Sequence, residues 1–415
     1  MTVLAPAASP GSSASPAGTA LRHAAPALLA YAAVRLLGVA VLGVWGAAAG
    51  SSPHQLLSAR WDSLWYTRVA ELGYGYEVRL ANGDVHSNLA FFPLLPWLER
   101  LLSAISPLSP ADAGLVVAWT ASLFAAWGIF AIADRLYGRR AGTLAVVLWA
   151  VLPVGIVQSM AYSETLFTAL AAWSLYALLS GRWVWAGVLA SLAGLTRPVG
   201  AAVVAAVWVA GAVTLIRESR AGGSDGGRPD DSGSGVGEWG VGGWSPDGPR
   251  GRWRMLWGVV LAPLGAAGYV LWVGHRTGGG LFGYLEVQGG WGNGFDGGLA
   301  FARFIGERLA SPAFAAGAGL IAGVLLVLWL YRLCLRQRQP LPLLVFCGIV
   351  VALALCASGY FGSKPRLLMP AFPLLLPVAV ALARLRTSRA VLVLGPVALA
   401  SAVYGALWLN GTGPP

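Results

Sequence analysis

Residues 26–49, PALLAYAAVRLLGVAVLGVWGAAA, form one apolar run, and the aromatic, charged segment RWDSLWY follows at residues 60–66. A helix needs about 20 apolar residues to cross a bilayer, so this run is long enough to span it. Similar runs recur along the 415 residues, which are 57% hydrophobic and 11% charged. Soluble proteins carry about 25% charged residues. The sequence therefore predicts an all-α, polytopic transmembrane protein.

The apolar runs predict about eleven membrane spans. After the first, we expect them at 113–133, 141–160, 162–180, 183–196, 198–216, 255–273, 312–331, 341–359, 366–383 and 389–409. The segment 183–196 is short and directly precedes Arg197-Pro198, so a half-helix or part of a kinked hairpin fits it as well. Residues 91–105 are too short and proline-rich to span, and we expect an interfacial or re-entrant helix there.

Composition divides the chain into four parts. Residues 1–24, rich in Ala, Ser, Pro and Gly, are predicted to form a disordered N-terminal tail. Residues 25–216 form an N-terminal transmembrane module whose outer loop, 51–112, is the expected site of chemistry. Residues 217–254 are predicted to be a disordered cytoplasmic linker, because they are dense in Gly, Ser, Asp and Pro. Residues 255–410 form a C-terminal transmembrane module.

The basic residues predict the orientation in the membrane. The net charge is +11, and arginines concentrate in alternate loops. Loops rich in basic residues stay in the cytoplasm, which places the N-terminus there. The charge therefore fits a multi-pass protein of the cell membrane and gives no reason to expect a nucleic acid partner. Five candidate residues then share the extracytoplasmic face: Asp62, Glu164, Arg197, Lys364 and Arg366.

Asp62 is the leading candidate for a catalytic group. A carboxylate held among tryptophans at a membrane surface is partly shielded from water and can act as a general base. If the segment continues as a helix, Trp61, Trp65 and Arg68 lie on one side and Asp62 faces the neighbouring side with Tyr66.

Simpler interpretations of this segment stay open. Trp and Tyr favour the membrane interface without any catalytic role, and Asp62 can be a helix-start residue that pairs with Arg60. His86, followed by Ser87-Asn88, is a weak candidate for polar contacts near Asp62.

Glu164 and Arg197 are the next candidates. Glu164 follows Tyr162-Ser163 between two apolar runs, where an unpaired acid is costly unless it has a function. The alternative is a helix-start carboxylate that the helix dipole favours. Arg197 lies beside a predicted helix break, where a guanidinium and free backbone N–H groups can hold phosphate. The alternative is an interfacial arginine that extends to water.

Lys364 and Arg366 precede a predicted helix, in the segment GYFGSKPR at 359–366. Cations are unfavourable at a helix N-terminus, and a bound anion removes that conflict. Lys364 is also the only lysine in the chain.

Other chemistries find no support in the sequence. The four histidines show no metal-ligand spacing, and three cysteines in or beside apolar runs give no disulfide framework. There is no phosphate-binding P-loop, dinucleotide fingerprint or Gly-x-Ser-x-Gly elbow. We therefore expect no metal and no cofactor.

Four short motifs, taken in order, resemble the PIG-V mannosyltransferase family. The first is the outer loop, from Trp61-Asp62 through AELGY at 70–74 to AFFPLLP at 90–96. The others are AYSETLF at 161–167, LTRPVG at 195–200 and PRLLMPAFP at 365–373. The set covers most of the folded chain, which resembles a bacterial member of this family. Some related enzymes carry a second acid beside the catalytic one, and Arg60 departs from that pattern.

The resemblance implies a GT-C type membrane glycosyltransferase. Such an enzyme moves a sugar, here mannose, from a polyprenyl-phosphate donor to a glycan, glycolipid or protein acceptor on the outer face, with inversion. By this resemblance Asp62 deprotonates the acceptor hydroxyl. The same resemblance assigns donor phosphate to Arg197, Lys364 and Arg366. The remaining candidates then bind substrate: Arg60, Trp61, Trp65, Tyr66, His86, Tyr162 and Glu164.

Two rival functions stay open. A transporter or lipid flippase also places polar residues beside broken helices. Against it, the sequence has no internal repeat, and its charged candidates gather at one face instead of the midplane. The other rival is a membrane scaffold without catalysis.

Overall fold

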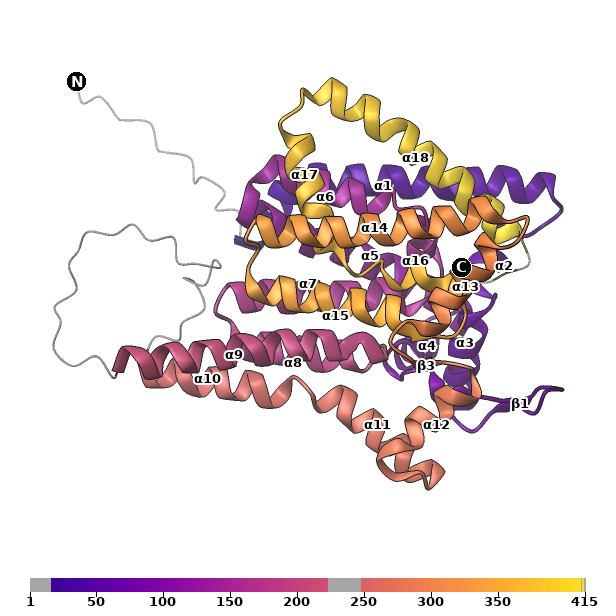
Figure 1. The fold of residues 1–415 in the computed structure, drawn as a ribbon, viewed down its shortest axis with the longest axis horizontal. Helices are drawn as coiled ribbons and strands as arrows, with labels where there is room; N and C mark the ends of the chain where they lie inside the picture. The colour runs from indigo at the N-terminus through magenta and orange to yellow at the C-terminus, as the bar shows by residue number, and fades with distance from the viewer. Residues whose placement is uncertain (1–15, 223–247, 412, 414–415) are drawn as a thin grey trace, which may run out of the picture.

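A computed structural model describes residues 16–222, 248–411 and 413, and these residues are mostly helical (Figure 1). Within this described part of the chain, six helical segments are long and apolar enough to cross a membrane, or seven if one bent pair counts as a span. They are α1 (Pro16–Ala48), α5 (Pro110–Tyr137), α9 (Ala201–Gly222), α10 with α11 (Gly248–Leu261, Leu264–Thr277), α14 (Phe314–Arg336) and α18 (Thr387–Asn410). The prediction of an all-α multi-pass membrane protein is confirmed.

Shorter helices fill the other predicted spans. They are α6 (Arg139–Ala150), α7 (Ser163–Leu179), α8 (Trp183–Gly194), α15 (Leu341–Cys356) and α17 (Leu376–Ala383). At 1.5 Å per residue, a helix of 12 residues such as α8 is roughly 18 Å long, short of the ~30 Å hydrocarbon core. The count of eleven spans therefore stays a prediction.

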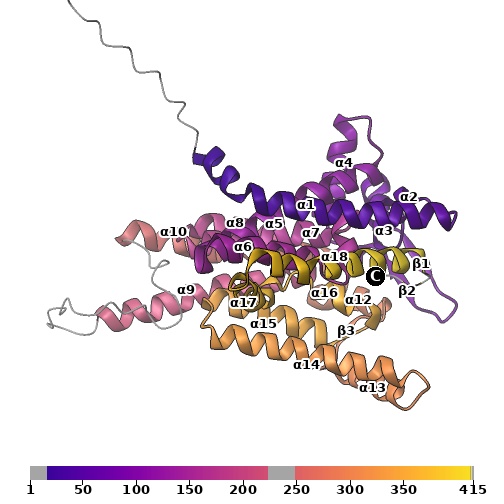
Figure 2. The same cartoon turned by 90° about the horizontal axis from the view of Figure 1, so that it is seen from above.

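Most of the long helices run side by side, and the elements of the first long loop gather at one end of the bundle (Figures 1 and 2). That loop folds into α2 (Pro53–Ser58), α3 (Asp62–Leu72), the hairpin β1–β2 (Glu77–Arg79, Val85–Ser87), the 3-10 turn η1 (Asn88–Ala90) and α4 (Leu94–Ile105). The predicted short helix at 91–105 is thus present as α4. Its interfacial position stays a prediction.

Late segments of the chain reach the same end. They are η4 (Gly280–Phe282), α12 (Gly283–Gly290), α13 (Leu299–Leu309), the short pair β3–β4 (Gly294–Phe295, Ala357–Ser358), η5 (Phe361–Ser363) and α16 (Lys364–Leu367). The end of the bundle that holds the β1–β2 hairpin therefore contains residues from both halves of the sequence.

The N-terminal and C-terminal halves of the chain pack on each other. Helix α8 packs on α10, α9 on α15, and α1 on α18. The α8–α10 contact depends on small residues, because a Cβ added to Gly187 would lie 2.3 Å from the carbonyl oxygen of Gly258. Each half thus buries its apolar faces against the other.

Two predicted boundaries differ from the structure. Helix α1 begins at Pro16, whereas the sequence predicts a disordered tail to residue 24. Helices α9 and α10 extend to Gly222 and from Gly248, into both ends of the predicted linker 217–254. Residues 1–15 and 223–247 lie outside the described part of the chain.

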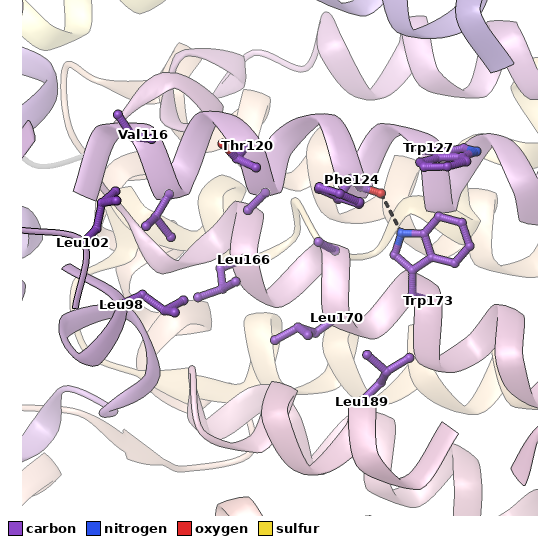
Figure 3. Close-up of a pocket in the computed structure, with 13 residues that line it drawn as sticks. Leu98, Leu102, Val116, Thr120, Phe124, Trp127, Leu166, Leu170, Trp173 and Leu189 are labelled. Atoms are coloured by element: carbon purple, nitrogen blue, oxygen red, sulfur yellow. Dashed lines mark hydrogen bonds between the residues drawn. The ribbon is translucent and has the colours of Figure 1, made fainter. Parts of the chain in front are cut away.

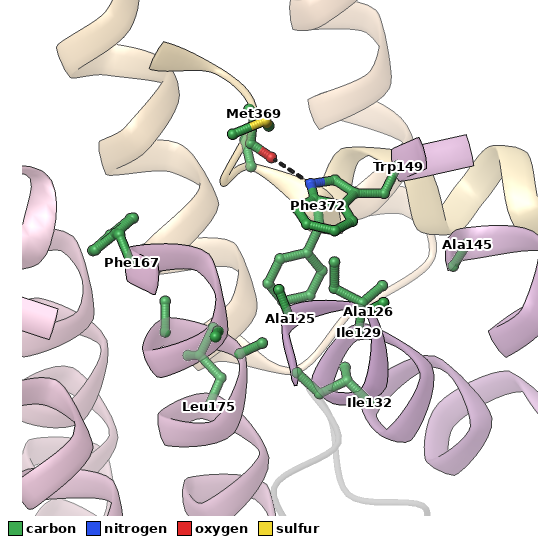
Figure 4. Close-up of a cluster of buried hydrophobic side chains, with 14 of the residues drawn as sticks. Ala125, Ala126, Ile129, Ile132, Ala145, Trp149, Phe167, Leu175, Met369 and Phe372 are labelled. Carbon is green, nitrogen blue, oxygen red and sulfur yellow. Dashed lines mark hydrogen bonds between the residues drawn. The ribbon is translucent and has the colours of Figure 1, made fainter. Parts of the chain in front are cut away.

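The predicted span at 366–383 is bent by 73° between Leu367 and Phe372. Pro370 lies in this break, and proline interrupts a helix because it has no backbone N–H. The break leaves the carbonyl oxygen of Met369 available to a side-chain donor. Buried Trp149 donates its indole N–H to this oxygen at 3.1 Å (Figure 4). The 3-10 turn η6 (Phe372–Leu375) then leads into α17.

A second break interrupts the predicted span at 141–160. Helix α6 ends at Ala150, and the chain continues as η2 (Gly155–Ser159). Buried Arg35 of α1 donates to the carbonyl oxygens of Ala150 and Gly155, across the break. A polar residue inside α1 therefore satisfies backbone groups that an apolar interior leaves without water.

We expect replacement of Arg35 by Met to destabilise the folded protein. Two buried carbonyls would lose their donors, at about 1–3 kcal/mol for each unsatisfied group. The measurement is the thermal midpoint in detergent, with Arg336→Met as control, because Arg336 is exposed at the end of α14. Equal midpoints for the two variants would contradict this role of Arg35.

Candidate active site

Asp62 is the first residue of α3, and the backbone before it has an unusual conformation. Trp61 has φ 53° and ψ −119°, a region that bulky residues rarely adopt. Trp61 is therefore outside the helix, and the prediction that Trp61 and Trp65 share one helical face is wrong. Such backbone costs of order 1–3 kcal/mol and tends to occur at functional sites.

The carboxylate of Asp62 pairs with an arginine from the far end of the sequence. Arg366 Nη1 lies 2.8 Å from Asp62 Oδ2. The Asp62 side chain is 26% exposed, and Oδ1 accepts no hydrogen bond from any described residue. Arg60, the alternative partner, donates instead to the carbonyl oxygens of Leu409 and Gly411. Asp62 therefore keeps one oxygen available to a ligand.

Glu164 joins the same network from α7. Its Oε1 forms ion pairs with Arg197 and, at 3.3 Å, with Nε of Arg366. The side chain of Glu164 is 2% exposed and that of Arg197 14%. The order Asp62–Arg366–Glu164–Arg197 alternates acid and base, and its formal charges sum to zero. Removal of one partner from a buried ion pair strongly destabilises the folded protein, because the other charge is left unpaired. The four residues therefore depend on one another.

Two tyrosines flank the network. The hydroxyl of Tyr162 lies 3.3 Å from the backbone N–H of Asp62, which donates to it, and the ring of Tyr162 lies under the Arg366 guanidinium at 5.2 Å. Tyr66 shares a hydrogen bond of 2.7 Å with the hydroxyl of Ser163. Burial raises the pKa of Tyr66, so its phenol stays neutral. Ser163 was not among the site residues predicted from the sequence.

Lys364 lies apart from these contacts. Its Nζ donates to the carbonyl oxygens of Ala354 and Ala357 at 2.8 and 2.9 Å, and it lies over the ring of Phe301 at 4.4 Å. It thus caps the C-terminus of α15, where a cation is favourable. Helix α16 is only four residues long, so the long helix expected to begin at Lys364 and Arg366 is absent. Nothing in these contacts favours phosphate binding by Lys364.

The aromatic residues of the first loop contact one another. Trp65 stacks on Phe91 with ring centroids 5.6 Å apart, and its edge meets Trp291 at 4.8 Å. His86 stacks on Trp291 at 4.1 Å and has no contact with Asp62 among the described interactions. The expectation of polar contacts from His86 to Asp62 is therefore not met. No sequence signal pointed to Trp291, which lies in a glycine-rich stretch.

Glu99 of α4 is a buried acid that was not among the residues predicted from the sequence. It is 0% exposed, and neither carboxyl oxygen has a hydrogen-bond partner. A Cβ added to Gly114 would lie 2.6 Å from Glu99 Oε1, so α5 packs directly on the carboxyl group. Burial raises the pKa of Glu99 well above its usual range, and the nearby Glu71 adds to the effect. A lone acid within an apolar segment was the available signal.

Two apolar grooves lie beside elements that carry the charged network, and none of its four residues lines either groove. The first, about 690 Å³, lies between α4, α5, α7 and α8 and includes Leu166, two residues beyond Glu164 (Figure 3). The second, about 600 Å³, lies between α8 and α11 and includes Leu195, two residues before Arg197, and Gly268. Within the described residues, no cluster of three or more His, Cys, Asp or Glu side chains is suited to a metal ion.

The arrangement combines the parts that group transfer from a phosphate requires. Asp62 offers an oxygen that can accept a proton, and two arginines nearby can neutralise an anion. The two grooves give apolar surfaces elsewhere on the helices that carry this region.

One family profile matches part of the chain, and its description agrees with this chemistry. The profile of the dolichyl-phosphate-mannose-protein mannosyltransferase family (PMT_2) matches residues 89–221. The match bears out the expected likeness to membrane glycosyltransferases at this level. The finer resemblance to the PIG-V family stays a prediction. No curated protein matches the chain.

Solved structures with similar folds have low sequence identity. ArnT from Cupriavidus metallidurans bound to undecaprenyl phosphate is 14% identical, with a TM-score of 0.48 over 87% of this chain and 62% of its own. The Archaeoglobus fulgidus oligosaccharyltransferase in its apo form is 15% identical, with a TM-score of 0.47 over 94% of this chain and 56% of its own. The present chain therefore spans less than two thirds of the length of either protein.

Burial of Glu99 predicts a specific pH dependence of stability. The unfolded chain ionises this carboxyl above about pH 4.3, whereas the folded chain keeps it protonated to a much higher pH. Unfolding then releases a proton, and stability falls as pH rises through the interval between the two pKa values.

We therefore expect Glu99→Gln to reduce the loss of thermal stability between pH 5 and pH 8. The matched control is Glu307→Gln, because Glu307 is exposed on α13. An unchanged pH dependence in Glu99→Gln would show that the buried carboxyl is not the titrating group.

Proposed function

We propose that this protein is a GT-C type membrane glycosyltransferase. It transfers a sugar, mannose, from a polyprenyl-phosphate donor to an acceptor hydroxyl, with inversion. One observation carries the proposal: Asp62, one of whose carboxylate oxygens has no partner among the described residues, is joined through Arg366 and Glu164 to Arg197. The family match over residues 89–221 supports the same class of reaction.

The proposed reaction assigns a role to each charge. Asp62 Oδ1 takes the proton of the acceptor hydroxyl, and the oxygen attacks the anomeric carbon from the side opposite the phosphate. The bond between that carbon and the phosphate oxygen breaks, and the polyprenyl phosphate leaves with the electron pair. Arg366 and Arg197 neutralise the growing negative charge, which lowers the barrier when such donors are fixed in advance.

Other residues of the site hold substrate or position these groups. Glu164 orients both arginines, and Tyr162 fixes the start of α3 through the backbone of Asp62. Tyr66 and Arg60 support the same segment, since Arg60 fastens it to the C-terminal end of α18. Trp61 and Trp65 supply ring surfaces for a sugar.

The proposed location is the cell membrane, with the site on the extracytoplasmic face and the N-terminus in the cytoplasm. The alternation of arginine-rich loops supports this orientation. A transporter or flippase is the second candidate, but it usually binds its cargo near the midplane. The network here lies instead at the bundle end that holds α3, the N-terminus of α7 and α16.

Replacement of Asp62 by Asn tests the reaction. We expect transfer of radiolabelled mannose from polyprenyl-phosphate mannose to fall by about 10²- to 10⁴-fold, the usual contribution of a general base. Donor binding should weaken far less than transfer, because Arg197 keeps its ion pair with Glu164 when Asp62 is replaced. The control is Asp84→Asn at the exposed hairpin tip. Equal transfer by the two variants would remove Asp62 as the base, and transport without transfer would favour the second candidate.

We further propose that the donor's isoprenoid tail occupies the groove between α8 and α11. Leu195, two residues before Arg197, lines this groove, whereas Leu166, two residues after Glu164, lines the first groove. Gly268 faces open space in it, since a Cβ there meets no atom within 4 Å. Larger side chains at Gly268 would therefore fill the groove without a clash.

We expect Gly268→Leu to raise the KM for a long-chain donor about tenfold and to leave a short-chain donor analogue unaffected. About two buried CH₂ groups displaced from the groove, at about 0.8 kcal/mol each, account for this magnitude. The control is Thr120→Phe, which fills the first groove. The reverse pattern would assign the tail to the first groove.

A further inference from the structure

A cluster of aromatic rings lies next to Asp62 and is not needed for the proton transfer or for the phosphate. It consists of Trp65 of α3, Tyr76 and His86 of the hairpin, Phe91, and Trp291 after α12. We call these five residues the aromatic platform. Four of its rings come from residues 65–91 and the fifth from residue 291, so the fold assembles it.

The platform is continuous with the site. Trp65 is three residues after Asp62 on α3, so the two side chains leave the helix on neighbouring faces. Phe91 contacts the edge of Tyr66 at 5.1 Å, and Tyr66 hydrogen-bonds Ser163, which precedes Glu164. A molecule on the platform is thus within reach of the proposed base.

The rings are accessible rather than buried. Tyr76 is 37% exposed, and the other four rings are half-buried. A purely structural aromatic core, such as Phe92 with 2% exposure nearby, excludes solvent almost completely. The platform therefore presents ring surface to a ligand.

Several polar groups at the edges of the platform have no partner in the described part of the chain, whereas the indole N–H of Trp291 donates to the carbonyl oxygen of Ser87 at 3.0 Å. The indole N–H of Trp65, both ring nitrogens of His86 and the hydroxyl of Tyr76 make no hydrogen bond there. The guanidinium of Arg68 lies over the Tyr76 ring at 3.8 Å and forms no ion pair with a described residue. Hydrogen-bond donors thus surround the exposed rings.

We infer that the aromatic platform is the acceptor subsite and that the acceptor is a carbohydrate. Sugar rings have an apolar face of C–H groups that packs on aromatic rings, and a rim of hydroxyls that bonds to edge donors. A peptide would be bound through backbone pairing with a strand edge, and β1 and β2 have three residues each. The inference depends on the proposed function, because the acceptor is the second substrate of that reaction.

The test measures sugar binding without donor, on the full-length protein in lipid nanodiscs. The probes are linear mannotriose, maltotriose and a Ser/Thr-rich peptide, and the readout is saturation transfer from protein to ligand in NMR. We expect at least one trisaccharide to bind, with the strongest transfer to its C–H protons. Trp65→Leu and Trp291→Leu should each weaken binding about tenfold, in line with the loss of one aromatic contact.

Two further variants separate binding from misfolding. Trp65→Phe keeps a ring and should restore most of the affinity. Trp329→Leu removes an exposed tryptophan of α14 that is distant from the platform, and it should bind like the wild type. In transfer assays, Trp65→Leu should raise the KM for the sugar acceptor and leave the KM for the donor unchanged.

Several results would overturn the inference. They are binding of the peptide but neither sugar, absence of sugar binding to the wild type, and equal sugar binding by Trp65→Leu and the wild type. Mannose transfer to the peptide would overturn the carbohydrate acceptor and leave the proposed function intact. Failure of the wild type to turn over the donor with any acceptor, while sugar still binds the platform, would overturn the proposed function alone.

Discussion

The site depends on the position of one guanidinium. Arg366 contacts both acids of the network, Asp62 and Glu164, and its own side chain is 9% exposed. A charge so far from water is stable only when its partners are present. Both acids are therefore fixed relative to each other by a group that belongs to neither of their helices, and α3, α7 and α16 must all be in place before the site exists.

The position of Arg366 follows from a broken helix. In a straight helix over 366–383, Arg366 would be part of one continuous membrane span. The 73° bend instead separates α16, which contains Arg366, from α17. The cost of the bend is exposed backbone in an apolar interior, and Trp149 offsets it by bonding to Met369. Arg35 does the same at the break that precedes Glu164. The charged network and the broken spans are thus parts of one structural solution.

Much of the site could be predicted from the sequence, because polar residues beside apolar runs are rare and costly. That rule selected Asp62, Glu164, Arg197 and Arg366, and the structure brings all four together. Their partners could not be predicted, since Asp62 and Arg366 are 304 positions apart and no local pattern links them. Lys364 shows the opposite error: it is two residues from Arg366, yet it caps α15. Trp291 could not be predicted from the sequence, because its contacts depend entirely on where α12 packs.

The most direct test of this account is whether the two acids act as one unit. Mannose transfer should be measured for Asp62→Asn, Glu164→Gln and the double variant. Residues that act together show strongly non-additive effects. We predict that the double variant is about as slow as Asp62→Asn alone, because loss of either acid disturbs the shared Arg366. If the two losses multiply, Asp62 and Glu164 contribute independently, and the network is not the basis of the site.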